Sequence, residues 1–246
     1  MKGGIRYSPF SILHKPLSFV YVGNFIYICG NVIGSRQKKP KTKTMKVLFL
    51  DNDGVICLSN NWGGRKKKWA KYRSANPESS SIIKEAPVEY RFDDFDNKAI
   101  KILNEIIEKT GCEIVVSSDW KLHATLEELG DYYESQGIIK RPIALTPNIQ
   151  NCTVHGNLFI WSPRWDLEQT RTIEIRQYLH DHPEVTHWVS VDDLNMGKNG
   201  EPWKDEWAID NFVLTPKSSE GIKQCGVKEK VIKFLTNEEH KTNIQD

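Results

Sequence analysis

Cysteine is scarce in this 246-residue chain, with five residues and no C-x-x-C pair among them. Widely spaced cysteines in odd number are not the pattern of a disulfide framework, and without paired spacing they do not suggest a zinc site. We therefore expect reduced thiols that pack like other small apolar side chains. The positions are Cys29, Cys57, Cys112, Cys152 and Cys225.

Acidic residues are missing from the first 44 positions, which hold eight Lys or Arg. Because that stretch contributes +8 to a formal net charge of +2, the remainder carries −6. Charge asymmetry of this kind indicates two differently built segments. We predict a leader over residues 1–44 and a globular domain over 45–240.

One long apolar run lies in the leader, at residues 17–34, and "RQKKPKTKT" follows soon after it. A membrane anchor with a basic flank has this pattern, although Asn24, Asn31 and several glycines weaken it. No clear cleavage site for a signal peptide precedes Arg36. The simpler alternatives to an anchor are a disordered leader and an extension upstream of a true translation start at Met45. We favour a dispensable leader and a cytoplasmic protein, with membrane attachment only if residues 17–34 form an anchor.

Three histidines gather in "HDHPEVTH", at His180, His182 and His187. Clustered histidines can hold a metal, but this stretch lies where a predicted helix meets Pro183. We predict a loop of solvated histidines there.

From Met45 onward, short apolar runs alternate with helical periodicity. Near-continuous apolar strands separated by helices indicate a parallel sheet covered on both faces. The expected fold is α/β, a doubly wound, Rossmann-like parallel sheet of about five strands with a small flap or cap inserted after the first strand, at about 58–95. Strands are predicted at 46–50, 112–118, 142–145, 186–193 and 211–215, and helices at 97–111, 121–138, 172–181 and 227–235.

Acids and hydroxyls lie at the carboxyl ends of three of these strands, and the carboxyl ends of parallel strands meet at one edge of the sheet. Four carboxylates gathered there would repel one another unless a cation neutralised them, and oxygen ligands without His or Cys suit Mg²⁺. Any one acid could instead cap a helix or lie in a loop. The residues are Asp51 and Asp53, Ser117 and Ser118, and Asp192 and Asp193.

A calcium-binding EF-hand loop is a second interpretation of "DNDG". Aligning Gly54 with the glycine of such a loop places Phe49 at the first ligand position and Asn60 where the bidentate glutamate belongs. The spacing therefore argues against it.

Several motifs together resemble a known family. "FLDNDGV", "IVVSSDW" and "VSVDD" are similar to the first, second and fourth motifs of the haloacid dehalogenase (HAD) superfamily. More narrowly, "SSDWKLHATLEEL", "LTPN", "TRTIEI", "VSVDD" and "FVLTPKSSEGI" resemble the HAD domain of Swiss Army Knife RNA repair proteins. The resemblance covers residues 46–235.

The resemblance implies a mechanism for the acids. Asp51 would attack phosphorus to form an aspartyl-phosphate, and Asp53 would act as general acid and base. Mg²⁺ would bind the Asp51 carboxylate, the Asp53 main-chain carbonyl and Asp192, with Asp193 next in line.

The phosphate-binding residues also follow from the resemblance. Either Ser117 or Ser118 would donate its hydroxyl to a phosphoryl oxygen. The superfamily usually has a lysine as its third motif, and the best match here is Arg171, which departs from the broad pattern but can grip phosphate with two hydrogen bonds. The alternative is an exposed helix arginine.

The segment after the first strand, "NNWGGRKKKWAKYR" at residues 60–73, interleaves cations with aromatics. Such a flap would suit single-stranded nucleic acid, with charge for phosphates and faces for bases. A flexible lysine run that attracts any anion is an equal alternative. The flap residues are Arg65, Lys66, Lys67, Lys68, Trp69, Lys71 and Arg73.

These observations predict a Mg²⁺-dependent phosphomonoester hydrolase that acts on a phosphorylated substrate, with nucleic-acid ends preferred. A small-molecule or nucleotide phosphatase remains an alternative. So does a non-catalytic module that binds phosphate or nucleic acid on the same fold.

Overall fold

The computed structural model describes residues 44–79, 81–148, 167–201 and 205–237, together with the backbone of four short strands. Contacts divide the chain into two compact units, Met1–Thr42 and Lys43–Asp246. In the first unit, β1 (Phe19–Val22) pairs antiparallel with β2 (Phe25–Ile28). The rest of the predicted leader up to residue 43 lies outside the described residues. In the part of the chain that is described, no helix has the length and apolar character to span a bilayer.

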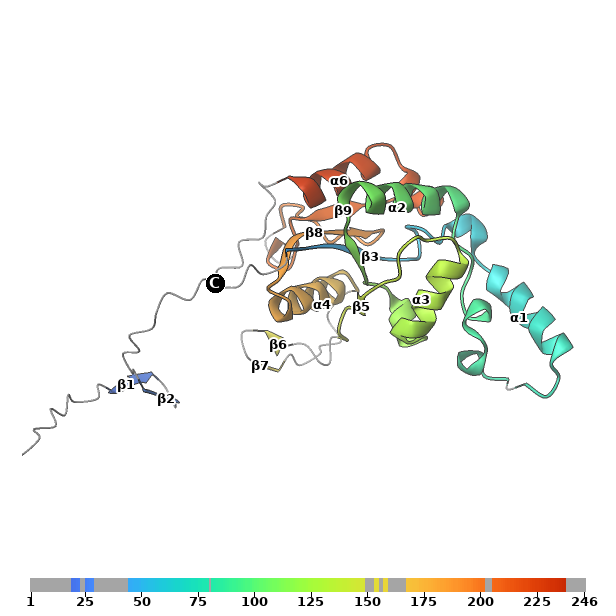
Figure 1. The fold of residues 1–246 in the computed structure, drawn as a ribbon, viewed down its shortest axis with the longest axis horizontal. Coiled ribbons are helices and arrows are strands. Elements are labelled where there is room, and N and C mark those ends of the chain that lie inside the picture. Colours follow the sequence, from blue (N-terminus) through green and yellow to red (C-terminus); the bar gives the residue numbers. More distant parts are fainter. Residues whose placement is uncertain are drawn as a thin grey trace, which may run out of the picture. The chain divides into compact units, whose positions relative to one another are not determined.

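The second unit is built on a five-stranded sheet whose order is β5-β4-β3-β8-β9 and whose pairings are all parallel (Figure 1). The predicted α/β fold and the doubly wound parallel sheet are therefore confirmed. Strand order reverses at β3, since the chain builds outward on one side and then crosses to the other. Ligands bind at such a switch point, beyond the carboxyl ends of the strands. The strands are β3 (Met45–Leu50), β4 (Glu113–Val116), β5 (Ala144–Leu145), β8 (Val185–Asp192) and β9 (Phe212–Leu214).

The central strand β3 is apolar on both faces because both faces are covered. Leu48 and Leu50 belong to a large core, and Val47 and Phe49 belong to a smaller one. Side chains of α2 (Asn97–Thr110), α3 (Leu126–Ser135) and α6 (Val227–Thr236) fill the large core, whereas those of α4 (Leu167–Asp181) fill the smaller one. Figure 1 shows α2 and α6 together on one side of the sheet and α4 on the other.

Local signals explain where the helices begin and end. Asp96 caps α2 by accepting from the amides of Lys98 and Ala99, and Gly111 ends it with φ 68°. The prediction of one helix over 121–138 was wrong. Residues Asp119–Leu122 form a 3₁₀ helix, and α3 starts afresh after Thr125, which forms a capping box with Glu128.

The insertion between β3 and α2 contains α1 (Gly64–Ala75), which buries none of its side chains. Polar contacts hold it instead. Asp93 accepts from the backbone amides of Gly63 (3.1 Å) and Arg65, and Asp94 pairs with Lys68 at 2.7 Å. Three 3₁₀ helices, Ser59–Asn61, Ile83–Glu85 and Val88–Tyr90, complete the insertion, and a further one, Gly221–Lys223, precedes α6.

Cysteines and histidines mostly follow expectation. Cys57 and Cys112 are buried free thiols and Cys225 is an exposed one, while Cys29 and Cys152 lie outside the described residues. The prediction of solvated histidines was wrong for His187, which is buried within β8 next to the hydroxyl of Thr186. It belongs to a strand that begins directly after the Pro183 turn, so its side chain faces a covered side of the sheet.

Candidate active site

A tight turn after β3 carries the first two acids. The carbonyl of Asn52 accepts hydrogen bonds from the amides of Val55, Ile56 and Cys57, which folds the chain back on itself. Gly54 has φ 71°, and a Cβ there would lie 2.1 Å from Oδ2 of Asp193. Only glycine satisfies both conditions, and the turn can therefore approach the end of β8 closely.

Three carboxylates meet at the rim that the strand ends form. Oxygens of Asp51, Asp192 and Asp193 lie within 4.8 Å of one another. Asp51 and Asp192 are buried, while Asp193 is half-buried and accepts a hydrogen bond from the Ser218 hydroxyl at 3.3 Å. An all-oxygen set without His or Cys has the chemistry that Mg²⁺ prefers, so the residues present fit that ion.

Arg171 lies among these acids. Its Nη1 donates to Asp51 Oδ1 at 3.0 Å, to Asp192 Oδ2 at 2.9 Å and to the Ser117 carbonyl. Its Nη2 donates to Asp119 Oδ1 at 3.2 Å, and the Asp119 side chain is 63% exposed. The predicted helix began at residue 172, but α4 already includes Leu167, which places Arg171 inside the helix. One buried guanidinium thus offsets part of the charge of two buried carboxylates.

Burial shapes the acid–base properties of the cluster. It raises the pKa of Asp51 well above its usual value, with repulsion from Asp192 adding to the rise and Arg171 opposing it. Burial also raises the pKa of Asp192 to about 6, again against the attraction of Arg171. The pKa of Asp193 is raised by burial as well. A bound divalent cation would favour the ionised form of all three.

The two serines at the end of β4 present unsatisfied hydroxyls. Ser117 and Ser118 are fully or almost fully buried, and neither Oγ has a hydrogen-bond partner among the described residues. The Ser118 hydroxyl is close enough to lower the pKa of Asp51, although the two groups do not make a well-formed hydrogen bond. Buried hydroxyls without partners are costly, so a ligand atom at this position would relieve them.

Asp53 stands apart from the three clustered carboxylates. Its Oδ2 accepts a hydrogen bond from the indole Nε1 of Trp120 at 2.8 Å. Burial raises the pKa of Asp53, and the bond from Trp120 opposes that rise. Sequence reasoning missed Trp120, although it lies two residues after Ser118 in "SSDW" and a buried indole N–H requires an acceptor.

A second buried ion pair supports the site and was also missed. Lys121 bonds to Glu174 of α4, and the two side chains are 5% and 6% exposed. Lys121 Nζ also donates to the Thr146 hydroxyl at 3.0 Å and to the Pro147 carbonyl at 3.2 Å. This pair joins the loop after β4 to the helix that carries Arg171.

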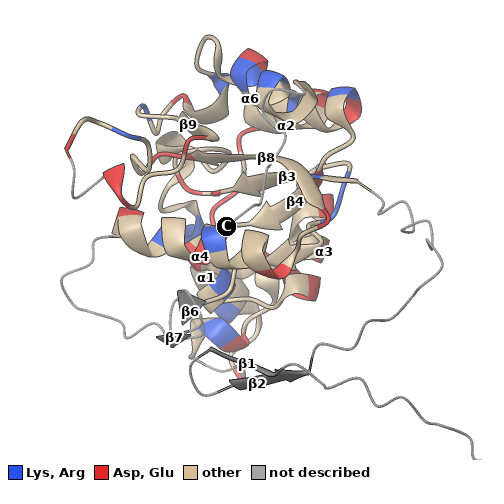
Figure 2. Cartoon of the chain, turned by 90° about the vertical axis from the view of Figure 1, so that its left-hand side faces the viewer, with Lys and Arg blue, Asp and Glu red and all other residues tan. Residues whose placement is uncertain are grey.

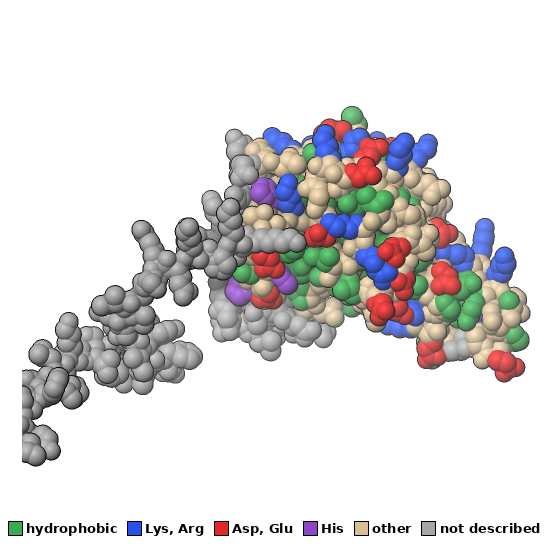
Figure 3. All heavy atoms as spheres, viewed as in Figure 1, with side chains coloured by type: hydrophobic (Ala, Val, Ile, Leu, Met, Phe, Trp, Pro, Cys, Tyr) green, Lys and Arg blue, Asp and Glu red, His purple; other side chains and the backbone are tan. Residues whose placement is uncertain are grey.

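The predicted flap residues fall into two groups. Arg65 lies 4.0 Å from Asp93 and near enough to Asp53 to lower its pKa, and Lys68 pairs with Asp94. The rest of the basic set is exposed and makes no ion pair within the described part of the chain. Figure 2 shows Lys and Arg along α1, and Figure 3 shows their side chains protruding beside apolar surface. The exposed cations are Lys66, Lys67, Lys71 and Arg73.

Aromatic side chains accompany these cations. The Trp69 ring stacks on Tyr72 with centroids 5.6 Å apart, and Tyr72 contacts Tyr90 at 4.4 Å. Trp62 is 49% exposed, and its indole donates to the carbonyl of Cys57 at 3.2 Å, at the end of the turn that carries Asp53. An exposed aromatic face therefore lies close to the acid-bearing turn.

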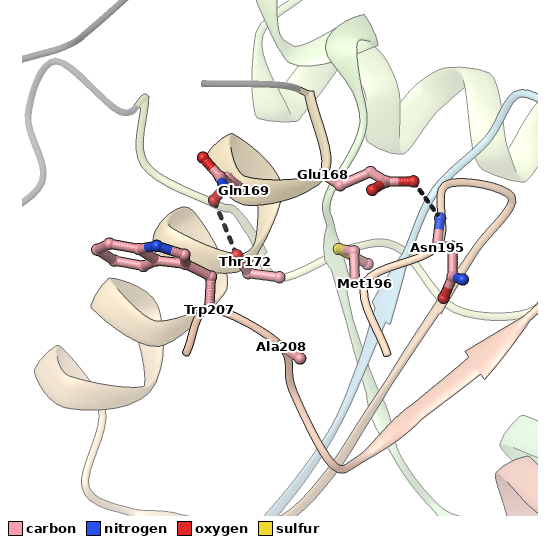
Figure 4. Close-up of a pocket in the computed structure, with 7 residues that line it drawn as sticks. All are labelled: Glu168, Gln169, Thr172, Asn195, Met196, Trp207 and Ala208. Atoms are coloured by element: carbon pink, nitrogen blue, oxygen red, sulfur yellow. Dashed lines mark hydrogen bonds between the residues drawn. The ribbon is translucent and has the colours of Figure 1, made fainter. Parts of the chain in front are cut away.

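A small pocket borders the rim between α4 and the loops after β8 (Figure 4). Glu168 accepts from the Asn195 amide across it at 3.0 Å. This pocket has room for roughly one water molecule and is therefore too small to hold a substrate. Residues 149–166 and 202–204, which include Trp161, Trp165 and Trp203, lie outside the described residues apart from two short strands, β6 (Thr153–Val154) and β7 (Asn157–Leu158). The lining residues are Glu168, Gln169, Thr172, Asn195, Met196, Trp207 and Ala208.

Comparison with known proteins identifies a family for this chain. No curated protein and no solved structure has significant similarity to the chain. One family model, described as the HAD domain in Swiss Army Knife RNA repair proteins, matches residues 47–226. That match spans the turn after β3, the serines, Arg171 and the acids at the end of β8. The chain therefore belongs to the family of HAD domains found in Swiss Army Knife RNA repair proteins.

Proposed function

We propose that this protein is a Mg²⁺-dependent phosphomonoesterase that works through an aspartyl-phosphate on Asp51 and takes phosphorylated nucleic-acid ends as substrates. One observation carries the proposal, namely the meeting of Asp51, Asp192 and Asp193 within 4.8 Å at the switch point of the sheet. Membership in a family of HAD domains, which are typically hydrolases, supports it.

The first step is nucleophilic attack by Asp51. Oδ1 of Asp51 accepts a hydrogen bond from Arg171, so the other oxygen is left to attack phosphorus. The bond between phosphorus and the ester oxygen breaks, and Asp53 gives its proton to the departing oxygen. In the second step Asp53 takes a proton from water, whose oxygen attacks the phosphorus and releases Asp51.

Phosphate recognition falls to Ser117, Ser118 and Arg171. The buried serine hydroxyls make no well-formed hydrogen bond within the described part of the chain and can donate to phosphoryl oxygens. Arg171 keeps Nη1 on the buried acids, whereas Nη2 can exchange the exposed Asp119 for a phosphate oxygen at little cost. Mg²⁺ held by Asp51, Asp192 and Asp193, with the Asp53 carbonyl, would supply the positive charge that lets an anionic phosphate approach.

The preference for nucleic-acid ends depends on the insertion. Its exposed cations would contact backbone phosphates, and Trp62, half-exposed beside the Asp53 turn, would stack on a base near the cleaved end. Arg65, at the start of α1, is close enough to Asp53 to lower its pKa, so this end of the insertion lies near the proposed general acid.

The test measures phosphate release by the wild-type protein and Asp51→Asn, with Mg²⁺ or EDTA. The substrates are p-nitrophenyl phosphate and oligonucleotides phosphorylated at the 3′ or 5′ end. We expect Mg²⁺-dependent turnover that the substitution abolishes and a higher kcat/KM for one oligonucleotide than for the aryl phosphate.

Other results point elsewhere. Turnover of small phosphates alone would replace nucleic-acid ends with a small-molecule substrate. Equal background rates for both proteins on every substrate would refute the enzymatic proposal, and retained RNA binding would then identify a non-catalytic module.

A further inference from the structure

We propose that Trp120 is the positioning residue for Asp53, fixing Oδ2 of that carboxyl so that Oδ1 exchanges the proton with the leaving group and with water. The inference rests on the proposed phosphomonoesterase function. It concerns a residue that neither the motifs nor the family match assigns to the reaction.

The hydrogen bond from Trp120 favours one oxygen of Asp53 as the carrier of the proton. Trp120 Nε1 lies 2.8 Å from Asp53 Oδ2. An indole N–H only donates, so Oδ2 must act as the acceptor in both protonation states of the acid. Because the carbonyl oxygen of a carboxylic acid accepts more strongly than its hydroxyl oxygen, the bond favours the exchangeable proton of Asp53 on Oδ1.

The donor is itself held in place. Trp120 is 4% exposed and lies parallel to Phe92, with ring centroids 4.1 Å apart and an interplanar angle of 9°. Phe95 stacks at 5.4 Å, and Tyr132 packs at 5.9 Å. Rotation of the indole would disrupt this cluster, so the direction of its N–H is set by packing in the large core.

The carboxyl needs such a constraint. The terminal torsion of an aspartate is broad, and Asp53 is only half-buried, so its oxygens could otherwise exchange places. The Cys57 thiol and the Arg65 charge also lie near enough to lower the pKa of Asp53, but the thiol directs its hydrogen bond to the Asp93 carbonyl at 3.8 Å, so neither group orients the carboxyl as the indole does. A general acid acts efficiently when its proton is already aimed at the leaving oxygen.

A merely structural bond would leave a different signature. If Asp53 served only to satisfy a buried indole, loss of the N–H would lower stability and slow all substrates alike. If Trp120 aims the acid, loss of the N–H should slow only those substrates whose leaving oxygen needs a proton. Nitrophenolate is a good leaving group and departs without a proton, whereas a sugar alkoxide must be protonated as it departs.

The experiment compares Trp120→Phe with wild type, using kcat/KM for p-nitrophenyl phosphate and for the phosphorylated oligonucleotides. That parameter stops at departure of the leaving group and excludes hydrolysis of the intermediate, which all substrates share. We expect a loss of about tenfold or more with the oligonucleotides and less than about threefold with the aryl ester.

Two controls isolate the hydrogen bond. Trp188→Phe alters a tryptophan of similar burial that contacts Phe49 in the other core, and it should not discriminate between leaving groups. Replacing Trp120 with β-(3-benzothienyl)alanine keeps the ring shape without the N–H, and it should reproduce the effect of phenylalanine.

A second measurement does not need activity. The ¹⁵N-indole spectrum contains the signal of Trp120, which Trp120→Phe identifies by its loss. Asp53→Ala should shift that signal, whereas Asp119→Ala, beside Trp120 in sequence, should shift it less.

The outcomes separate the two claims. Equal losses on all substrates, or an indole signal unaffected by Asp53→Ala, would overturn the inference while leaving the phosphomonoesterase intact. A wild-type protein that cleaves none of the substrates would refute the proposed function itself, and the assigned role of Trp120 with it.

Discussion

Substitution of Arg171 tests whether its guanidinium stabilises the protein by neutralising the buried carboxylates of the rim. Its Nη1 lies 3.0 Å from Asp51 and 2.9 Å from Asp192, and all three side chains are at most 7% exposed. Arg171→Met keeps much of the volume but leaves two buried carboxylates without their counter-ion. Breaking a buried pair in this way costs about 3–5 kcal/mol.

The corresponding shift in melting temperature follows from the size of the unit. For a domain of 150–250 residues, 1 kcal/mol corresponds to about 2–4 °C, so we expect Tm to fall by about 6–20 °C in EDTA at pH 7.5. Thermal unfolding followed by circular dichroism measures it. The matched control is Arg176→Met, an exposed arginine of the same helix that donates to the Ala208 carbonyl, which should cost no more than about 1 kcal/mol.

The loss should also depend on pH and on metal. Burial already raises the folded-state pKa of Asp51 and Asp192, and removing Arg171 raises both further. The penalty belongs to the ionised carboxylates, so it is full above the folded-state pKa of the variant and shrinks as the pH falls from there towards the wild-type value, about 6 for Asp192. Mg²⁺ at about 100 times its Kd should restore roughly 2.7 kcal/mol to any form that binds it. A pH-independent loss, or one below 2 °C, would refute this account of the cluster.

Two further outcomes follow from the structure. Gly54→Ala should raise the Mg²⁺ concentration for half-maximal turnover at least about tenfold, because the added Cβ would clash with Asp193. Gly111→Ala is the control, since Gly111 has φ 68° but an added Cβ there would meet no atom within 4 Å, so this variant should share only the backbone strain. An equal Mg²⁺ requirement in both variants would contradict the close approach. Trp62→Ala should weaken oligonucleotide binding by about 1–3 kcal/mol and leave aryl phosphate turnover unchanged, as measured by fluorescence anisotropy and steady-state rates; unchanged binding would remove Trp62 from the proposed surface.

The acids at the strand ends could be predicted from sequence because parallel pairing leaves little freedom. Once 46–50 and 186–193 are recognised as strands of one parallel sheet, Asp51 and Asp192 must emerge at the same edge. The same logic brings in the serines after β4. Backbone geometry, rather than side-chain detail, determines this part of the site.

The same reasoning could not predict contacts between side chains that are distant in sequence. Trp120 and Asp53 are 67 residues apart, and Lys121 and Glu174 are 53 apart. Both pairs depend on how the loop after β4 packs against other elements, which no local pattern records. By contrast, the start of α3 was readable from Thr125 and Glu128, because a capping box is a local signal.

The central position of β3 has a consequence for synthesis on the ribosome. A nascent chain that has emerged only as far as β5 can pair β3 with β4 along one edge, while the other edge waits for β8. Asp51 then has neither Asp192 nor Arg171 beside it. Asp51, the proposed nucleophile, is thus synthesised early but completes its surroundings late. Until β8 arrives, the open edge of β3 is the point where a growing chain is most exposed to wrong pairing.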